Sequence, residues 1–131
     1  MRLFIGVLLA AIFLGPLPGF AEEAAARGEY LTRRASMCVE CHTPRDAKGN
    51  LLESKLFHGA PVPVLQPEFA TAWALRAPNL TGWPGYTHEQ AVHFLQTGER
   101  PNGTHARPPM PQYRLNSEDA EAVVAYLQGL H

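Results

Sequence analysis

Apolar and small residues recur at helical spacing between residues 22 and 36. Ala24, Gly28, Leu31 and Ala35 follow one another at intervals of three or four positions, with charged residues between them. This spacing predicts an amphipathic helix over 22–36. Glycine inside a helix costs about 1 kcal/mol relative to alanine, so we expect Gly28 to permit close contact with another helix.

Two further helices are predicted in the second half of the chain. Thr87 and Gln90 have the spacing of a capping box, and Gly98 is a typical residue for the end of the helix that follows them. Asn116 and Asp119 indicate the start of a last helix. The apolar residues of that helix recur at i, i+3, i+4 and i+7, and they are Ala120, Val123, Val124 and Leu127.

The region between Cys41 and Tyr86 has no sustained periodicity. It is interrupted by prolines, which exclude long helices and central strands, and we expect only a short helix near 69–75. A loop of this length is uncommon in a compact domain unless it is functional, so we expect it to wrap a cofactor. The prolines are Pro44, Pro61, Pro63, Pro67, Pro78 and Pro84.

The first 21 residues have the layout of a secretory signal peptide. A cationic start at Met1 and Arg2 precedes an apolar run over 3–14, helix-breaking Gly and Pro residues, and small residues before a cleavage point after Ala21. The apolar run is shorter than the roughly 20 residues that span a bilayer, which makes a permanent transmembrane anchor the weaker alternative. We therefore expect a signal peptide at 1–21 and one domain at 22–131 that works outside the cytoplasm.

Composition narrows the possible functions. The chain has 131 residues, with 11 basic and 12 acidic side chains and a formal net charge of −1. It therefore lacks the basic excess with which proteins neutralise a nucleic-acid backbone, and we expect no nucleic-acid partner. Two cysteines occur in the whole chain, too few for a disulfide framework, which indicates a chemical role for them.

Both cysteines lie in Cys38–His42, a segment of the form C-x-x-C-H. This is the attachment signature of a c-type haem, in which each thiol forms a thioether and the following imidazole binds the iron. A thioredoxin-like dithiol is one alternative, but it requires a βαβ setting. A tetrahedral zinc site is another, but it requires two further ligands. The sequence thus favours one covalent haem c held through Cys38 and Cys41, with His42 as a ligand of its iron.

Three other segments accompany this motif: Gly28–Leu31 in the first predicted helix, the run Arg107–Pro111, and Ala125–Leu127 in the last helix. With them the chain resembles the monohaem class I cytochromes c, and its middle is similar to bacterial cytochrome c subunits that serve periplasmic dehydrogenases. The resemblance implies a small all-α fold, with three to four helices around one covalently bound haem and long irregular loops. It also implies that the first and last helices cross near Gly28 and Tyr126.

Met110 matches the position of the sixth iron ligand in that family. It lies in a proline-rich loop just before the last helix, and a thioether is a soft ligand that raises the reduction potential of a haem. The alternative is that Met110 only fills a gap in the core. Met37 adjoins the attachment motif, and we expect it not to reach the other face of the haem.

Other side chains give further alternatives. A second histidine would give bis-imidazole ligation, although a lone histidine is more often a surface or hydrogen-bonded residue; the four are His58, His88, His93 and His105. Four aromatic residues are expected to pack on the haem or to hydrogen-bond its propionates, with ordinary core packing as the alternative: Trp73, Trp83, Tyr86 and Tyr113.

The resemblance implies a periplasmic one-electron carrier rather than an enzyme. Its partners would be redox proteins, with a periplasmic dehydrogenase as donor and an oxidase or another cytochrome as acceptor. Membrane association would come only through a partner or a retained leader. Two alternatives stay open: a haem subunit permanently bound to a dehydrogenase, and a haem protein with an open iron site that acts as a peroxidase or gas sensor.

Overall fold

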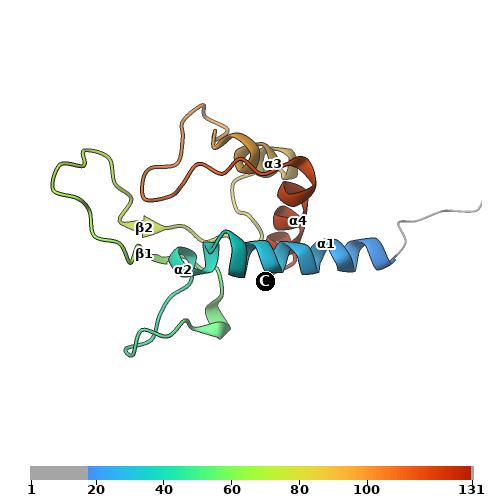
Figure 1. The fold of residues 1–131 in the computed structure, drawn as a ribbon, viewed down its shortest axis with the longest axis horizontal. Helices are drawn as coiled ribbons and strands as arrows, with labels where there is room; N and C mark the ends of the chain where they lie inside the picture. The colour runs from blue at the N-terminus through green and yellow to red at the C-terminus, as the bar shows by residue number, and fades with distance from the viewer. Residues whose placement is uncertain (1–17, 131) are drawn as a thin grey trace, which may run out of the picture.

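The computed structural model describes residues 18–130. Within them the chain forms four α-helices and one small antiparallel sheet (Figure 1). The helices are α1 (Pro18–Tyr30), α2 (Cys38–His42), α3 (His88–Thr97) and α4 (Ser117–Gln128). A π-helical turn at Leu31–Ala35 continues α1, a 3-10 turn spans Glu53–Lys55, and the strands are β1 (Ala60–Pro61) and β2 (Arg76–Ala77). The predicted all-α fold is confirmed.

The predicted helix over 22–36 begins earlier than expected, at Pro18, and ends in the π-helical turn. The predicted leader lies outside the described residues except for 18–21, which form the start of α1. None of the helices in the described part of the chain combines the length and the apolar character that crossing a membrane requires.

Helices α1 and α4 cross where Gly28 faces Ala122 and Tyr126 (Figure 1). A Cβ atom placed on Gly28 would lie 2.1 Å from the Ala122 carbonyl oxygen and 2.6 Å from Tyr126 Cβ. The predicted close contact at this glycine is therefore confirmed. Just beyond it, the buried Thr32 hydroxyl donates to the Gly28 carbonyl at 2.9 Å, within the segment where α1 passes into the π-helical turn.

The start signals of α3 and α4 and the end signal of α3 are as predicted. Thr87 and Gln90 form a reciprocal capping box, and Gly98 follows α3 with a φ of 78° that favours glycine. Asn116 accepts the Asp119 backbone N–H at 2.8 Å. The inner faces of these helices and of α2 share one apolar core, built from Leu31, Val39, Phe57, Trp83, Ala91, Val92, Leu95, Ala120, Val123, Val124 and Leu127.

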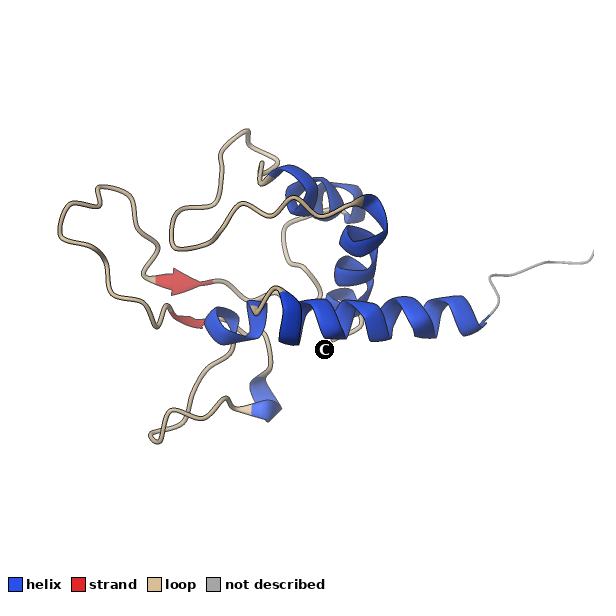
Figure 2. Cartoon of the chain, in the orientation of Figure 1, coloured by secondary structure: helices blue, strands red, loops and turns tan. Residues whose placement is uncertain are grey.

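Long loops make up the middle of the chain, as the prolines predicted (Figure 2). The expected short helix at 69–75 is wrong, because this stretch forms only turns and bends within a lobe between β1 and β2. Phe69 and Leu75 are largely exposed, so no buried apolar face stabilises a helix there. The two strands themselves were not predicted, and they pair Ala60 with Ala77.

Candidate functional site

A cavity of about 440 Å³ lies between α2, the middle loops, α3 and α4. Its volume is within the range of roughly 300–1,000 Å³ typical of cofactor sites. The sequence-predicted site residues Cys38, Cys41, His42 and Met110 all line it, and so do buried apolar side chains. Residues far apart in the sequence are thus brought to one partly open, largely apolar space.

Both cysteines are free thiols in the structure and are partly buried. Burial raises the pKa of the Cys38 thiol to about 11 and raises that of Cys41 as well. Reactive C-x-x-C dithiols instead have lowered pKa values, so the cavity does not favour a thioredoxin-like dithiol. Within residues 18–130 no three His, Cys, Asp or Glu side chains gather as a metal site, which leaves the zinc alternative without further ligands.

His42 is buried and fixed in one tautomer. Its Nδ1 lies 2.8 Å from the Pro78 carbonyl oxygen, and because a carbonyl only accepts, Nδ1 carries the proton. Burial lowers the pKa of His42, and the Pro78 hydrogen bond opposes that change in part. The ring is therefore neutral, and the Nε2 lone pair is left for a ligand. A histidine whose Nδ1–H is held by a carbonyl is the usual form of an iron- or zinc-binding imidazole.

Two hydrogen bonds position the turn that carries His42. The Gly59 N–H donates to the His42 carbonyl at 2.8 Å. Gly59 has a φ of 81°, and a Cβ there would lie 2.8 Å from the Asn79 nitrogen, so a glycine is required. The buried Thr43 hydroxyl accepts the Phe57 N–H at 3.0 Å. The segment before β1 is thus held against α2, and Gly59 packs against the Pro78–Asn79 segment, whose Pro78 carbonyl meets the imidazole.

Met110 is half-buried at the cavity in a loop held at three points. Its backbone N–H donates to the Arg107 carbonyl at 3.2 Å, and the Pro108 carbonyl accepts the Ala74 N–H at 2.7 Å. Three residues further on, the Tyr113 hydroxyl donates to the Ser36 carbonyl at 2.6 Å. These contacts tie the loop both to the lobe between the strands and to the segment before Cys38. Met37 also lines the cavity, but it is 55% exposed.

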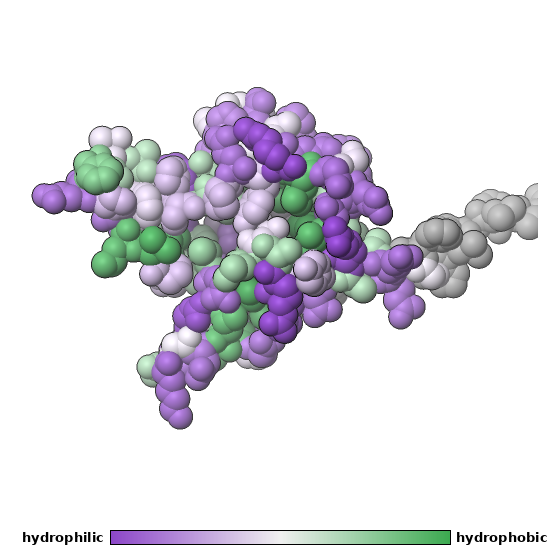
Figure 3. All heavy atoms as spheres, viewed as in Figure 1, coloured by the Kyte–Doolittle hydropathy of each residue, from purple (hydrophilic) through white to green (hydrophobic). Residues whose placement is uncertain are grey.

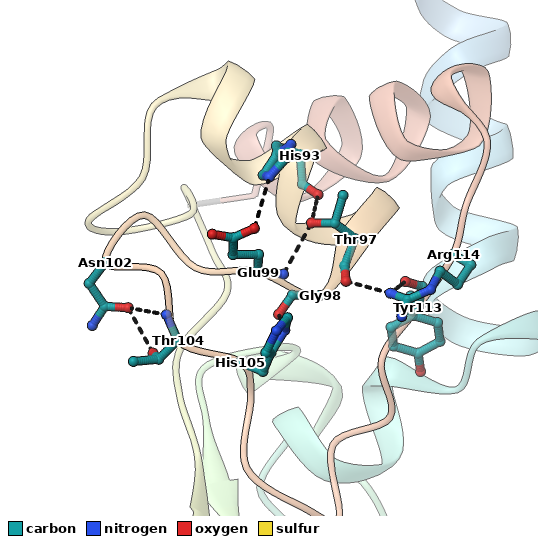
Figure 4. A network of polar contacts seen from close by, with 9 residues as sticks. All are labelled: His93, Thr97, Gly98, Glu99, Asn102, Thr104, His105, Tyr113 and Arg114. Atoms are coloured by element: carbon teal, nitrogen blue, oxygen red, sulfur yellow. Dashed lines mark hydrogen bonds and ion pairs between the residues drawn. The ribbon is translucent and has the colours of Figure 1, made fainter.

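The four alternative histidines do not line the cavity. His105 Nδ1 bonds the Gly98 carbonyl and His93 faces Glu99 (Figure 4). His88 lies between Glu121 and Gln128, and His58 contacts the Leu56 carbonyl. Among the described histidines only His42 therefore faces this space.

Three of the four expected aromatic residues line the cavity: Trp83, Tyr86 and Tyr113. The prediction for Trp73 is wrong, because this side chain is absent from the lining and its Nε1–H points to the Val64 carbonyl at 3.4 Å. Trp73 belongs to the lobe between the strands, and no pattern in the sequence indicated which residues this segment would contact.

Three arginines that sequence reasoning missed also line the cavity. They are Arg76, Arg100 and Arg107, and no acidic side chain lines it with them. None takes part in the ion pairs found within residues 18–130. No sequence signal marked them as cavity residues, because they come from β2 and from the loop between α3 and α4, which meet only in the fold. They give the cavity a positive charge suited to a group that carries carboxylates.

These features fit a c-type haem. The cavity holds two thiols at attachment spacing, a neutral imidazole with one free nitrogen, a thioether, and an apolar lining. The positive charge of the lining suits the propionates of such a group.

The chain matches a family model and a curated relative. Residues 23–127 match the family model described as cytochrome C oxidase, cbb3-type, subunit III. The chain is also similar to the fructose dehydrogenase cytochrome subunit of Gluconobacter japonicus, with 30% identity over 118 residues. That alignment covers 79% of this chain and 21% of the relative, so the chain spans about a fifth of the length of the curated relative it matches.

Proposed function

The chain belongs to the cytochrome c family described as cytochrome C oxidase, cbb3-type, subunit III, and from this premise we propose that it is a periplasmic one-electron carrier with His42 and Met110 as its axial iron ligands. Membership of the family means an electron-transfer protein with covalently bound haem c and its iron. When bound, the haem supplies one-electron exchange between ferrous and ferric iron. The chain's own residues determine how the haem is held and which groups bind its iron.

Cys38 and Cys41 would hold the haem as thioethers, and His42 would supply Nε2 as a ligand of its iron. The Pro78 carbonyl keeps the proton on Nδ1, so the imidazole binds without first losing a proton. Met110 offers a soft thioether that stabilises the reduced state and raises the potential. With His42 and Met110 both bound to the iron, no coordination site would be open to a substrate, and the chain would act as a carrier.

The buried apolar part of the lining would keep water away from the iron. Trp83, Leu95 and Leu127 line the cavity and are buried, and an apolar, closely packed surround limits rearrangement when the charge changes. Arg100, the half-buried one of the three arginines, is placed to bind a propionate. Fixed ligands and a dry surround favour transfer in both directions.

One observation carries the ligand assignment: Met110 lines the same cavity as His42, whereas the four alternative histidines are outside its lining. The test is the near-infrared sulfur-to-iron charge-transfer band of the oxidised holoprotein. We expect the band in the wild type and in Met37→Leu, and its loss in Met110→His, which keeps six-coordination at a lower potential. If the wild type lacks the band, or if only Met37→Leu loses it, Met110 is not a ligand of the iron.

A second candidate function is a haem subunit held permanently in a dehydrogenase. The name of the Gluconobacter japonicus relative, a dehydrogenase cytochrome subunit, favours it. Sedimentation of the protein released gently from its own cells distinguishes the two. A free carrier sediments as the single chain, whereas a permanent subunit sediments together with a larger dehydrogenase complex.

A further inference from the structure

The segment 62–75 forms an exposed lobe between β1 and β2, here called the 62–75 lobe. Within the described residues six large hydrophobic side chains are exposed, and four of them belong to this lobe. Figure 3 shows apolar side chains gathered on this projecting part of the molecule. The four are Val64, Leu65, Phe69 and Leu75, with Leu65 at 91% and Phe69 at 89% exposure. Soluble proteins rarely expose apolar groups so closely together unless something binds there.

The 62–75 lobe is held in place at its base. The Val62 N–H donates to the Leu75 carbonyl at 3.0 Å, next to the β1–β2 pair. The Ala74 N–H donates to the Pro108 carbonyl at 2.7 Å, and the Gln66 side chain donates to the Ala70 carbonyl at 2.8 Å. The apolar side chains are therefore presented on a defined surface.

The base of the 62–75 lobe also borders the haem cavity, because Val62 and Ala74 belong to the lobe and line the cavity. Arg76 follows the lobe directly, and Arg107 precedes the Pro108 carbonyl to which the lobe is bonded. Both arginines are exposed cavity-lining residues, whereas Arg100 is half-buried. An apolar surface flanked by two exposed positive charges thus adjoins the redox centre.

We propose that the 62–75 lobe is the docking surface for a redox partner protein whose contact face has an apolar centre flanked by carboxylates that pair with Arg76 and Arg107. The inference rests on the proposed electron-transfer function. A molecule docked on the 62–75 lobe lies at the edge of the cavity, as electron exchange between two proteins requires. The lobe has 14 residues, fewer than the roughly 20–30 a side of a standard interface, which fits a brief encounter.

Two other occupants agree less well with the charges. An anionic lipid surface would meet Glu68 beside Phe69 on the exposed part of the lobe. In a two-fold contact between copies of this chain the same patch meets itself, so Arg76 and Arg107 would approach like charges. An acidic partner protein pairs with both arginines and covers the apolar side chains.

The experiment compares Leu65→Ser/Phe69→Ser with Tyr30→Ser in the haem-loaded protein. Tyr30 is an exposed aromatic residue on α1, 54% exposed, outside the lobe and the cavity lining. Each reduced protein is mixed with respiratory membranes from the organism that makes it, and its oxidation is followed at the haem absorption band. In parallel, tris(phenanthroline)cobalt(III) serves as a small oxidant that needs no docking surface.

We expect the double variant to react with the membranes about tenfold more slowly, as for the loss of central contact residues. Tyr30→Ser should keep the wild-type rate, and all three proteins should react equally with the cobalt complex. The wild-type rate should fall as salt rises from about 10 to about 200 mM, because screening weakens the arginine–carboxylate pairs. Equal membrane rates for the wild type and the double variant, or a rate that rises with salt, would overturn the proposal.

Two further measurements decide between occupants. Co-sedimentation of the wild type, but not of the double variant, with phosphatidylglycerol vesicles would assign the 62–75 lobe to a lipid surface and overturn the proposal. A wild-type dimer in sedimentation velocity that the double substitution dissociates would do the same in favour of a second copy. If the holoprotein fails to reduce even the cobalt complex, the proposed function itself fails; if only the lobe substitution has no effect, the docking surface alone is wrong.

Discussion

Replacing Gly28 by alanine should destabilise the protein, although alanine is the better helix former. The added Cβ would lie 2.1 Å from the Ala122 carbonyl oxygen and 2.6 Å from Tyr126 Cβ. Both contacts involve atoms on or next to the backbone of α4, which cannot turn aside as the end of a flexible side chain can. The two helices must therefore separate.

Two opposing effects set the magnitude. Overpacking costs typically about 1–3 kcal/mol, and contacts this short with backbone atoms belong at the upper end. Alanine returns about 1 kcal/mol of helix propensity. The expected result is a net loss of about 2 kcal/mol in the free energy of unfolding. For a domain of this size that is a fall of roughly 10 °C in Tm.

The assay is guanidinium unfolding of the haem-loaded protein, followed by circular dichroism. Gly129→Ala is the matched control, because it adds the same methyl group where the nearest atoms lie at 3.4 and 3.5 Å and φ is −76°. We expect the control to stay within about 0.5 kcal/mol of the wild type. A Gly28→Ala protein as stable as this control would refute the crossing contact as described.

Two other substitutions test particular contacts. Tyr113→Phe removes the hydroxyl that donates to the Ser36 carbonyl. We expect the free energy of unfolding to fall by about 1 kcal/mol and the near-infrared band to weaken. If neither quantity changes, Tyr113 does not support the Met110 loop. The pKa of His88 is raised because its ring nitrogens donate to Gln128, the larger cause, and to Glu121. The stability that protonated His88 contributes is therefore fully present below its unfolded pKa of about 6.5. It is lost as the pH rises through the higher folded pKa. His88→Gln should therefore be less stable than the wild type at pH 5.5 and nearly equal to it at pH 9, measured by thermal melts; an equal difference at both pH values would contradict the assignment.

Features set by local chemistry could be predicted from the sequence. The caps at Thr87 and Asn116 predicted where α3 and α4 begin, and the C-x-x-C-H spacing identified the haem motif. Gly28 indicated a helix crossing because a glycine inside a helix needs a compensating reason. These signals lie within a few residues of the structure they specify.

Features set by distant contacts could not be predicted. The Pro78 carbonyl that orients His42 is 36 positions away, and no local pattern indicates a backbone oxygen as a partner. The helix expected at 69–75 failed for the same reason, since its apolar residues lie on an exposed lobe instead of facing a core. Trp73 was assigned to the haem by residue type alone, whereas its neighbours are those of the lobe.

Carbon monoxide binding by the reduced holoprotein tests the central claim most directly. If His42 and Met110 occupy both axial positions, the wild type should bind carbon monoxide slowly and incompletely at neutral pH, while Met110→Ala should bind it rapidly and stoichiometrically. Rapid, stoichiometric binding by the wild type would contradict the account and would favour an open iron site suited to a peroxidase or a gas sensor.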